Sequence, residues 1–312
     1  MTGFGFDPKG AVAHLRKADP ALASVPVIFM TGLAETEQIV EGFASGGVDY
    51  VVKPLKIPEV LARLRQRGIR WVATPSCGAA TWASAEGAHP HWEYKGKHGA
   101  AHWGALEPGF EACARGAAQS PIDIRNTVKE ALPALDFQYT AGAPTLVNNG
   151  HTVQVNMPAG SKLVVDGKAM ELLQFHFHTP SEEAIGGKHA AMVAHFVHKA
   201  ADGGLGVVAV LIQPGKTNAA WAPIFAHLPR VGEQVTVDGL TLDASTLLPA
   251  KKGYYSFAGS LTTPPCSEGV QWMVLKEPVK LGAQQIKAFR QLYNANARPV
   301  QPLNGRIVKE ST

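Results

Sequence analysis

Three histidines in two apolar segments constrain this chain more than any other feature. Histidine and phenylalanine alternate along residues 174–178, and a third histidine, His195, lies in a second apolar segment at 191–198. Alternate side chains of a β-strand share a face, so His176 and His178 are expected to point the same way. With His195 from a neighbouring strand they would form the three-nitrogen ligand set of a catalytic zinc site, which leaves one position open for water. Two packed histidines in an aromatic strand remain the alternative for the His-x-His pattern alone.

The composition and charge are those of a globular protein. The 312 residues predict one large or two smaller domains, and a hydrophobic content of 46% is sufficient for a packed core. The net charge of +4 comes from scattered Lys and Arg residues, which argues against nucleic-acid binding. No apolar run approaches the roughly 20 residues that a membrane-spanning helix requires, so we expect no membrane span.

The two ends of the chain differ in pattern. Residues 1 to 70 alternate expected strands, at 25–30 and 48–52, with expected helices, and this order predicts a parallel α/β sheet. The expected helices cover 11–18, 35–45 and 58–67. From residue 89 onward, short strands separated by Gly, Pro and Asn turns dominate, and helical spacing is found mainly at 281–293. This part is predicted to be a mostly β domain of the α+β class.

Two segments near the N-terminus, PVIFMTG at 26–32 and GGVDYVVKP at 46–54, carry a family pattern. They resemble the C-terminal half of a response-regulator receiver domain. The resemblance implies that Thr31 is the switch hydroxyl, that Lys53 contacts phosphate and that Pro54 follows a cis bond. The acidic residues that bind metal and accept phosphate in that family lie before the matching region. We therefore expect the first 70 residues to be a partial receiver-like fragment without a phosphoryl site.

Residues 71–88 are rich in Ala, Ser, Gly and Thr, a composition typical of a linker. A second interpretation stays open. Several arginines precede Trp71, and Ala83-Ser84-Ala85 has the small-x-small form of a signal cleavage site, although Pro75 and Ser76 interrupt the apolar centre. The segment is therefore expected to be either a linker or a decayed or displaced export signal.

Several long motifs follow one another from residue 89 to the end of the chain. They are HWEY at 91–94, QSPIDI at 119–124, NNGH at 148–151, QFHFHTPSE at 174–182, AHFVH at 194–198, SLTTPPCSEGVQW at 260–272 and ARPVQPLNGR at 297–306. In this order they resemble an α-class carbonic anhydrase over residues 89–312. The resemblance implies a central, mainly antiparallel, twisted β-sheet with short peripheral helices.

The resemblance also implies a zinc enzyme that hydrates CO2 reversibly to bicarbonate and a proton. His176, His178 and His195 would bind Zn2+, and a hydroxide on the metal would attack CO2. Zinc lowers the pKa of a bound water from about 15.7 to about 7, a magnitude known from carbonic anhydrase itself. The Thr262 hydroxyl would accept the hydroxide's proton in a hydrogen bond and would donate its own proton to Glu182.

Further residues match the substrate and proton pathways of that family. Thr263 would position bicarbonate. His151 matches the proton shuttle, because an exposed imidazole with a pKa near neutrality can pass protons to buffer. Tyr94 would order the water molecules between zinc and His151. The apolar wall that holds CO2 would consist of Val197, Val207, Leu261 and Trp272.

A zinc-bound histidine usually donates its other N–H group to an acceptor outside the ligand set. The resemblance implies that Gln174 accepts from His176 and that a backbone carbonyl near Asn296 accepts from His178.

His195 marks the clearest departure from the family pattern. The family places a Glu two residues before this histidine, where the present chain has Val193, and Glu183 stands where His or Asn is frequent. Because a valine cannot orient an imidazole, we expect weakened zinc retention. The alternative function is a catalytically silent binding module.

The three cysteines Cys77, Cys113 and Cys266 allow at most one intrachain disulfide, and their spacing alone does not assign it. The carbonic anhydrase resemblance implies the pair Cys113–Cys266, as in exported bacterial members, with two reduced core cysteines as the alternative. A disulfide implies an oxidising compartment. We therefore expect a periplasmic or secreted protein, or a cytoplasmic one if the N-terminal segment is retained. The resemblance also allows a homodimer.

Overall fold

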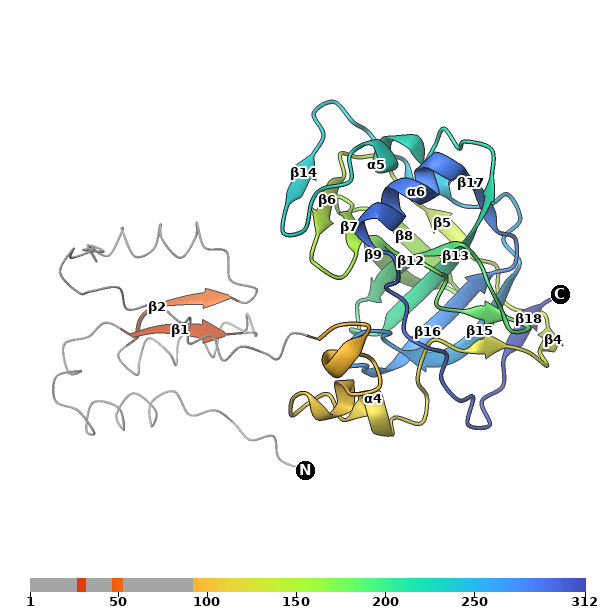
Figure 1. Ribbon diagram of the computed structural model, residues 1–312, viewed down its shortest axis with the longest axis horizontal. Coiled ribbons are helices and arrows are strands. Elements are labelled where there is room, and N and C mark those ends of the chain that lie inside the picture. Colours follow the sequence, from red (N-terminus) through yellow and green to blue (C-terminus); the bar gives the residue numbers. More distant parts are fainter. Residues whose placement is uncertain (1–26, 32–46, 53–91) are drawn as a thin grey trace. The chain divides into compact units, whose positions relative to one another are not determined.

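The structure is a computed structural model that describes residues 27–31, 47–52 and 92–312 (Figure 1). The chain divides into two units, Met1–Ala83 and Ser84–Thr312, which are described separately. In the first unit, β1 (Val27–Thr31) and β2 (Gly47–Val52) pair in parallel, as predicted for two strands of an α/β sheet. The other predictions for residues 1–88 lie outside what the structure describes, namely the helices at 11–18, 35–45 and 58–67, the side-chain roles of Thr31, Lys53 and Pro54, and the segment 71–88.

The second unit is built from many short strands and a few long ones. In chain order they are β3 (Asp123–Ile124), β4 (Val128–Glu130), β5 (Asp136–Gln138), β6 (Thr145–Asn148), β7 (Val153–Asn156), β8 (Lys162–Val165), β9 (Lys168–His178), β10 (Ala184–Ile185), β11 (Lys188–His189), β12 (Met192–Ala200), β13 (Leu205–Gly215), β14 (Gln234–Thr236), β15 (Tyr254–Ser260), β16 (Glu268–Leu275), β17 (Val279–Gly282) and β18 (Lys309–Ser311).

Most of these strands belong to one 13-stranded sheet with the path β14-β6-β7-β9-β12-β13-β16-β15-β18-β4. Strand β17 pairs with β13, while β8 pairs with both β5 and β9. Neighbouring strands are antiparallel except for the pairs β13–β16, β13–β17 and β18–β4. Strands β3, β10 and β11 form a separate small sheet. The prediction of a mostly β fold around a mainly antiparallel sheet is confirmed.

Helices are short and peripheral, as predicted. The α-helices are α4 (Ala112–Arg115), α5 (Ala222–Ala226) and α6 (Ala283–Leu292), and the 3-10 helices are η2 (Gly96–His98), η3 (Trp103–Ala105) and η4 (Ala244–Leu247). Within the described part of the chain, no helix combines the length and apolar character that crossing a membrane requires.

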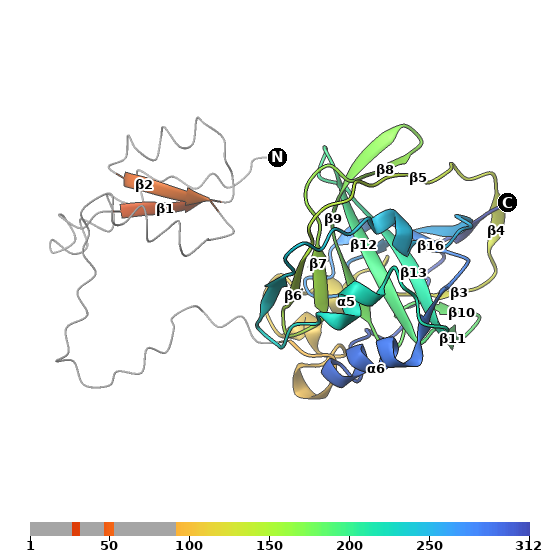
Figure 2. The same cartoon turned by 90° about the horizontal axis from the view of Figure 1, so that it is seen from above.

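The central strands β9, β12 and β13 bury different side chains on their two faces. On one face, Phe175 stacks on Phe196 with ring centroids 4.8 Å apart. Phe177 on this face contacts Phe225 of α5 and Phe289 of α6, at 5.5 and 5.6 Å. Figure 2 shows these two helices together on one side of the domain. Because side chains alternate along a strand, the histidines next to these phenylalanines are placed on the opposite face.

The N-terminal part of the second unit is fastened to the sheet by a disulfide. Cys113 of α4 is bonded to Cys266, which follows β15, with an S–S distance of 2.03 Å. The two cysteines and Trp103 form a small buried cluster of their own. This is the pairing that the sequence resemblance implied.

Candidate metal centre

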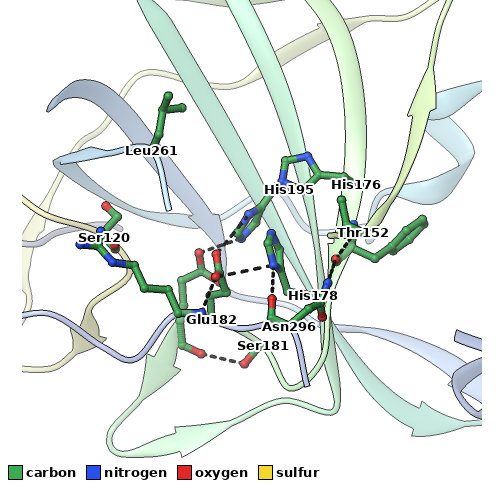
Figure 3. Close-up of polar contacts among 12 residues, drawn as sticks. Ser120, Thr152, His176, His178, Ser181, Glu182, His195, Leu261 and Asn296 are labelled. Carbon is green, nitrogen blue, oxygen red and sulfur yellow. Dashed lines mark hydrogen bonds and ion pairs between the residues drawn. The ribbon is translucent and has the colours of Figure 1, made fainter. Parts of the chain in front are cut away.

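Strand register places the three histidines at one point of the sheet. His195 of β12 lies directly opposite His176 of β9, and His178 lies two residues further along β9. The ring centroids are 5.0 Å apart for His176 and His178, 5.5 Å for His176 and His195, and 4.8 Å for His178 and His195. One ring nitrogen of each residue lies within 4.8 Å of the other two. Figure 3 shows the three imidazoles gathered together, as the alternating pattern predicted.

The two histidines of β9 have hydrogen-bond partners that leave the same ring nitrogen for a metal. His176 donates from Nδ1 to Oε1 of Gln174 at 2.9 Å, and His178 donates from Nδ1 to the backbone oxygen of Asn296 at 2.7 Å. Both partners are the ones expected from the sequence. The buried Nε2 atom of His178 has no hydrogen-bond partner. An orphaned buried nitrogen of this kind fits a metal ion, since buried polar atoms are otherwise satisfied.

His195 uses its ring in the opposite sense. Its Nε2 donates to Oε1 of Glu183 at 2.9 Å, so Nδ1 is the nitrogen left for the cluster. The sequence pointed to no acceptor for this ring in place of the family's Glu, because Val193 cannot orient it, but Glu183 supplies one. Val193 is fully buried in the apolar cluster on this face. The loop after β9 instead carries Glu183 back over β12, and the sequence-based expectation of weakened zinc retention loses its basis.

The electrostatics of the cluster suit a divalent cation. Burial lowers the pKa of His176 to about 3 and that of His178 well below its usual value, with the neighbouring histidines adding to the effect. Both rings are therefore neutral near pH 7, the state in which histidine binds metal. Burial also lowers the pKa of His195, but the charge and hydrogen bond of Glu183 and the charge of Glu182 outweigh it and raise the pKa. The same negative field favours a cation among the three rings.

Glu182 lies beside the cluster as a completely buried carboxylate. Its Oε1 accepts a hydrogen bond from the backbone N–H of Arg298 at 2.7 Å and is 3.6 Å from Nδ1 of His178. Burial raises its pKa to about 7, whereas the charge of His195, the Arg298 N–H and hydrogen bonding from Thr262 oppose the rise. Glu182 therefore lies next to His178 and His195, and Thr262 is close enough to its carboxylate to influence the pKa.

Arg298 is a supporting residue that the sequence did not single out. Its guanidinium is almost fully buried and donates to Oε1 of Gln119 and to the backbone oxygens of Ser120 and Cys113, at 2.9, 2.6 and 2.9 Å. Its backbone N–H at the same time holds Glu182. The residue lies inside the motif at 297–306, but nothing in a linear motif indicates that one arginine joins the N-terminal segment to the carboxylate.

Aromatic residues near the N-terminus of the domain lie beside the predicted shuttle and the histidine cluster. The His151 ring stacks on Trp92, with ring centroids 3.7 Å apart and planes inclined by 8°. Oδ1 of Asn149 accepts from the backbone N–H of His151 at 3.0 Å and shapes the turn. The Tyr94 ring meets His178 edge-on at 6.5 Å, and burial raises the pKa of its hydroxyl well above the usual value. Trp92 lies within the HWEY motif, but nothing in that motif indicates that its ring packs on His151.

The residues predicted to form an apolar wall lie on the same face as the histidines. Val197 pairs with Val207 across β12 and β13, and Val207 pairs with Trp272 across β13 and β16. The ring of Trp272 lies 4.9 Å from that of His195. Leu261 packs against this cluster, and Figure 3 includes it with the site residues. Thr263, the residue predicted to position bicarbonate, is half-buried in the loop that follows Thr262.

Comparison with known proteins gives the same assignment as the geometry. Residues 98–312 match the eukaryotic-type carbonic anhydrase family. The chain belongs to this family. It is 44% identical over 219 residues to a carbonic anhydrase of Pectobacterium carotovorum, covering 70% of this chain and 90% of that protein. It is also 44% identical over 257 residues to a carbonic anhydrase of Neisseria gonorrhoeae, covering 82% of this chain and 99% of the relative.

A solved structure extends the likeness of the carbonic anhydrase domain to three dimensions. The α-carbonic anhydrase of Thermovibrio ammonificans, in complex with the inhibitor sulfanilamide, superposes with a TM-score of 0.69 at 43% identity. The match covers 72% of this chain and 99% of the other. The family match at 98–312 includes the three histidines and Glu182, so the carbonic anhydrase domain contains the complete cluster.

Proposed function

We propose that the domain is a zinc-dependent carbonic anhydrase that converts CO2 and water reversibly into bicarbonate and a proton. One observation carries this proposal: three imidazoles converge, and each directs its other nitrogen to an acceptor. Three nitrogen ligands and an open fourth position are the donor set of catalytic zinc. When bound, zinc supplies Lewis acidity that makes a water molecule nucleophilic near neutral pH.

The chain's own residues would hold and orient the reacting groups. Nε2 of His176, Nε2 of His178 and Nδ1 of His195 are the nitrogens available to the metal. Thr262 would donate a hydrogen bond from its hydroxyl to Glu182, so that the threonine oxygen accepts a hydrogen bond from the attacking water or hydroxide and orients it. The Arg298 N–H fixes the carboxylate for this task. Orientation by such outer partners typically contributes about 10–100-fold to metal affinity or activity.

CO2 and the released proton would use different surfaces of the site. Val197, Val207, Leu261 and Trp272 would offer CO2 an apolar wall, and the Trp272 N–H is already bonded to the backbone oxygen of Ser260 at 3.0 Å. Thr263 would position bicarbonate. His151 would carry the released proton to buffer, a role that suits an imidazole at the edge of a site. Tyr94 would order water between the cluster and His151.

The silent binding module is the weaker alternative. It depended on Val193 leaving His195 without support, and Glu183 supplies that support.

We also propose a periplasmic or secreted location. The Cys113–Cys266 disulfide supports it, because such bonds persist in oxidising compartments, and so do the bacterial relatives. We propose three parts for the chain: a partial receiver-like fragment at 1–70, a linker or signal-like segment at 71–88, and the carbonic anhydrase domain at 89–312. The parallel pairing of β1 and β2 is consistent with the first part. The family resemblance also supports a homodimer as a further proposal.

The decisive experiment measures CO2 hydration by stopped flow with zinc-loaded full-length protein. The wild type should hydrate CO2 and should be inhibited by sulfanilamide, whereas His178→Ala should lose both properties. His227→Ala is a matched control, because this histidine is exposed just after α5 and its side chain donates to the backbone oxygen of Pro223. Equal hydration rates in the wild type and His178→Ala would overturn the proposal.

A further inference from the structure

Glu183 reaches the metal cluster from outside the two strands that supply it. The residue follows β9 and directly precedes β10, and its side chain is only 1% exposed. Its Oε1 accepts from Nε2 of His195 at 2.9 Å, across 12 residues of sequence. Glu183 therefore contacts the one ligand that comes from β12.

The loop that carries Glu183 is fixed by its own hydrogen bonds. The Ser181 hydroxyl donates to the backbone oxygen of Glu183 at 2.7 Å, and its Oγ accepts a hydrogen bond from the Ala190 N–H at 2.8 Å. His189 donates from Nδ1 to the Ser181 backbone oxygen at 2.7 Å, and pairs with Ala184 in the β10–β11 hairpin. These bonds fix the backbone at Glu183, and burial restricts the rotamers of its side chain. Little conformational entropy is therefore left to be lost when the carboxylate binds His195.

The strand itself offers His195 no such partner. Val193, two residues earlier on the same side of β12, is completely buried and lies opposite His178. Its side chain has no hydrogen-bonding group. Among the described residues, the Glu183 carboxylate is the group that accepts a hydrogen bond from Nε2 of His195.

We propose that Glu183 is the positioning residue for His195. Its carboxylate keeps the hydrogen on Nε2, so the lone pair of Nδ1 faces the metal, and it fixes the plane of the ring. In this chain the carboxylate comes from the loop after β9 instead of from position 193. The inference rests on the proposed zinc function. From Val193 alone, the sequence predicted weakened zinc retention; we assign to Glu183 the support that keeps zinc bound.

The proposal makes positions 183 and 193 alternative sources of one carboxylate. Removing the Glu183 carboxylate should loosen zinc, and a glutamate introduced at 193 should restore it. A residue that merely packs the loop would give no such rescue, because filling position 193 would not repair a defect at 183.

The test is zinc release from the full-length holoprotein into excess dipicolinate, followed as zinc remaining on the protein. Glu183→Ala should speed release by about 10–100-fold, the usual effect of losing an outer partner of a zinc ligand. Glu183→Gln keeps an acceptor oxygen and should give an intermediate rate. The double variant Glu183→Ala with Val193→Glu should return to within about threefold of the wild type. Visible spectra of the cobalt-substituted proteins should change and recover in the same order.

Two results would overturn the inference. One is release from both Glu183→Ala and Glu183→Gln at the wild-type rate; the other is faster release that Val193→Glu does not repair. If Glu183→Ala does not fold, the Gln variant and the double variant decide the matter by the same comparison. A wild-type protein that takes up no zinc would overturn the proposed function as well, and so the two failures are distinguishable.

Discussion

Strand β12 carries two buried histidines three residues apart, and its two faces give them opposite properties. His195 faces Glu183 and Glu182, whose charges outweigh burial and raise its pKa. His198 shares a hydrogen bond of 2.7 Å with the Tyr139 hydroxyl, and burial lowers its pKa to about 4. The Tyr139 ring stacks on Phe196, so His198 belongs to the phenylalanine-rich side of the sheet.

The comparison shows that the face of a strand, and not the residue type, decides what a histidine does. On the phenylalanine side, an imidazole is one more packed ring with a single polar partner. On the other side, the same ring meets carboxylates and two further imidazoles. Stability and chemistry are therefore carried by alternate residues of the same strands, and neighbouring substitutions should separate them.

The largest effect is expected from the apolar face. Phe177→Ala should lower the free energy of unfolding by about 3–5 kcal/mol, because it removes a fully buried ring that packs on Phe225 and Phe289. Zinc release should change by less than about tenfold, since the ring points away from the cluster. Urea unfolding and zinc release into chelator measure the two quantities. Loss of zinc without loss of stability would contradict the division between the faces.

His176→Ala, one residue earlier, should show the reverse. Binding of zinc to a structural site with four ligands is worth about 10–16 kcal/mol, roughly 2.5–4 kcal/mol per ligand. The zinc dissociation constant should therefore rise about 10²–10³-fold. The free energy of unfolding of the zinc-free protein should change by less than about 1 kcal/mol, because His176 is only half-buried. Competition with a metal indicator and urea unfolding check the two values. A wild-type zinc affinity in this variant would remove His176 from the ligand set.

The smallest effect concerns pH. His198 has an ordinary pKa of 6.5 and a folded-state pKa lowered to about 4, so folding favours its neutral form. Its contribution to stability is complete above about pH 6.5 and falls as the pH drops toward 4, by about 3 kcal/mol in total. His198→Gln retains a side-chain hydrogen-bonding group for Tyr139 but does not titrate. Between pH 7 and pH 4, the wild type should therefore lose more unfolding free energy than this variant. An equal loss in both proteins would contradict the lowered pKa of His198.

Much of the fold and the site could be predicted from the sequence because the signals are local. Alternation along 174–178 predicted a strand and a shared histidine face, and this strand is the end of β9. The family resemblance that the ordered motifs carry implied the sheet, the disulfide partners, and the contacts of Gln174 and Asn296 with the histidines. Each of these signals lies within a few residues of sequence or in a motif whose spacing the family fixes.

Val193 and Glu183 show where prediction from the sequence ends. The sequence by itself determined which residues are imidazoles, carboxylates and phenylalanines, and which of them alternate on a strand. It also showed that position 193 lacks a carboxylate. Only the tertiary structure decided that the loop after β9 returns over β12 and brings Glu183 to His195, and that the Arg298 N–H meets Glu182. A hydrogen bond depends on distance in space, and the folding of a loop onto a strand sets that distance through contacts that no local pattern records.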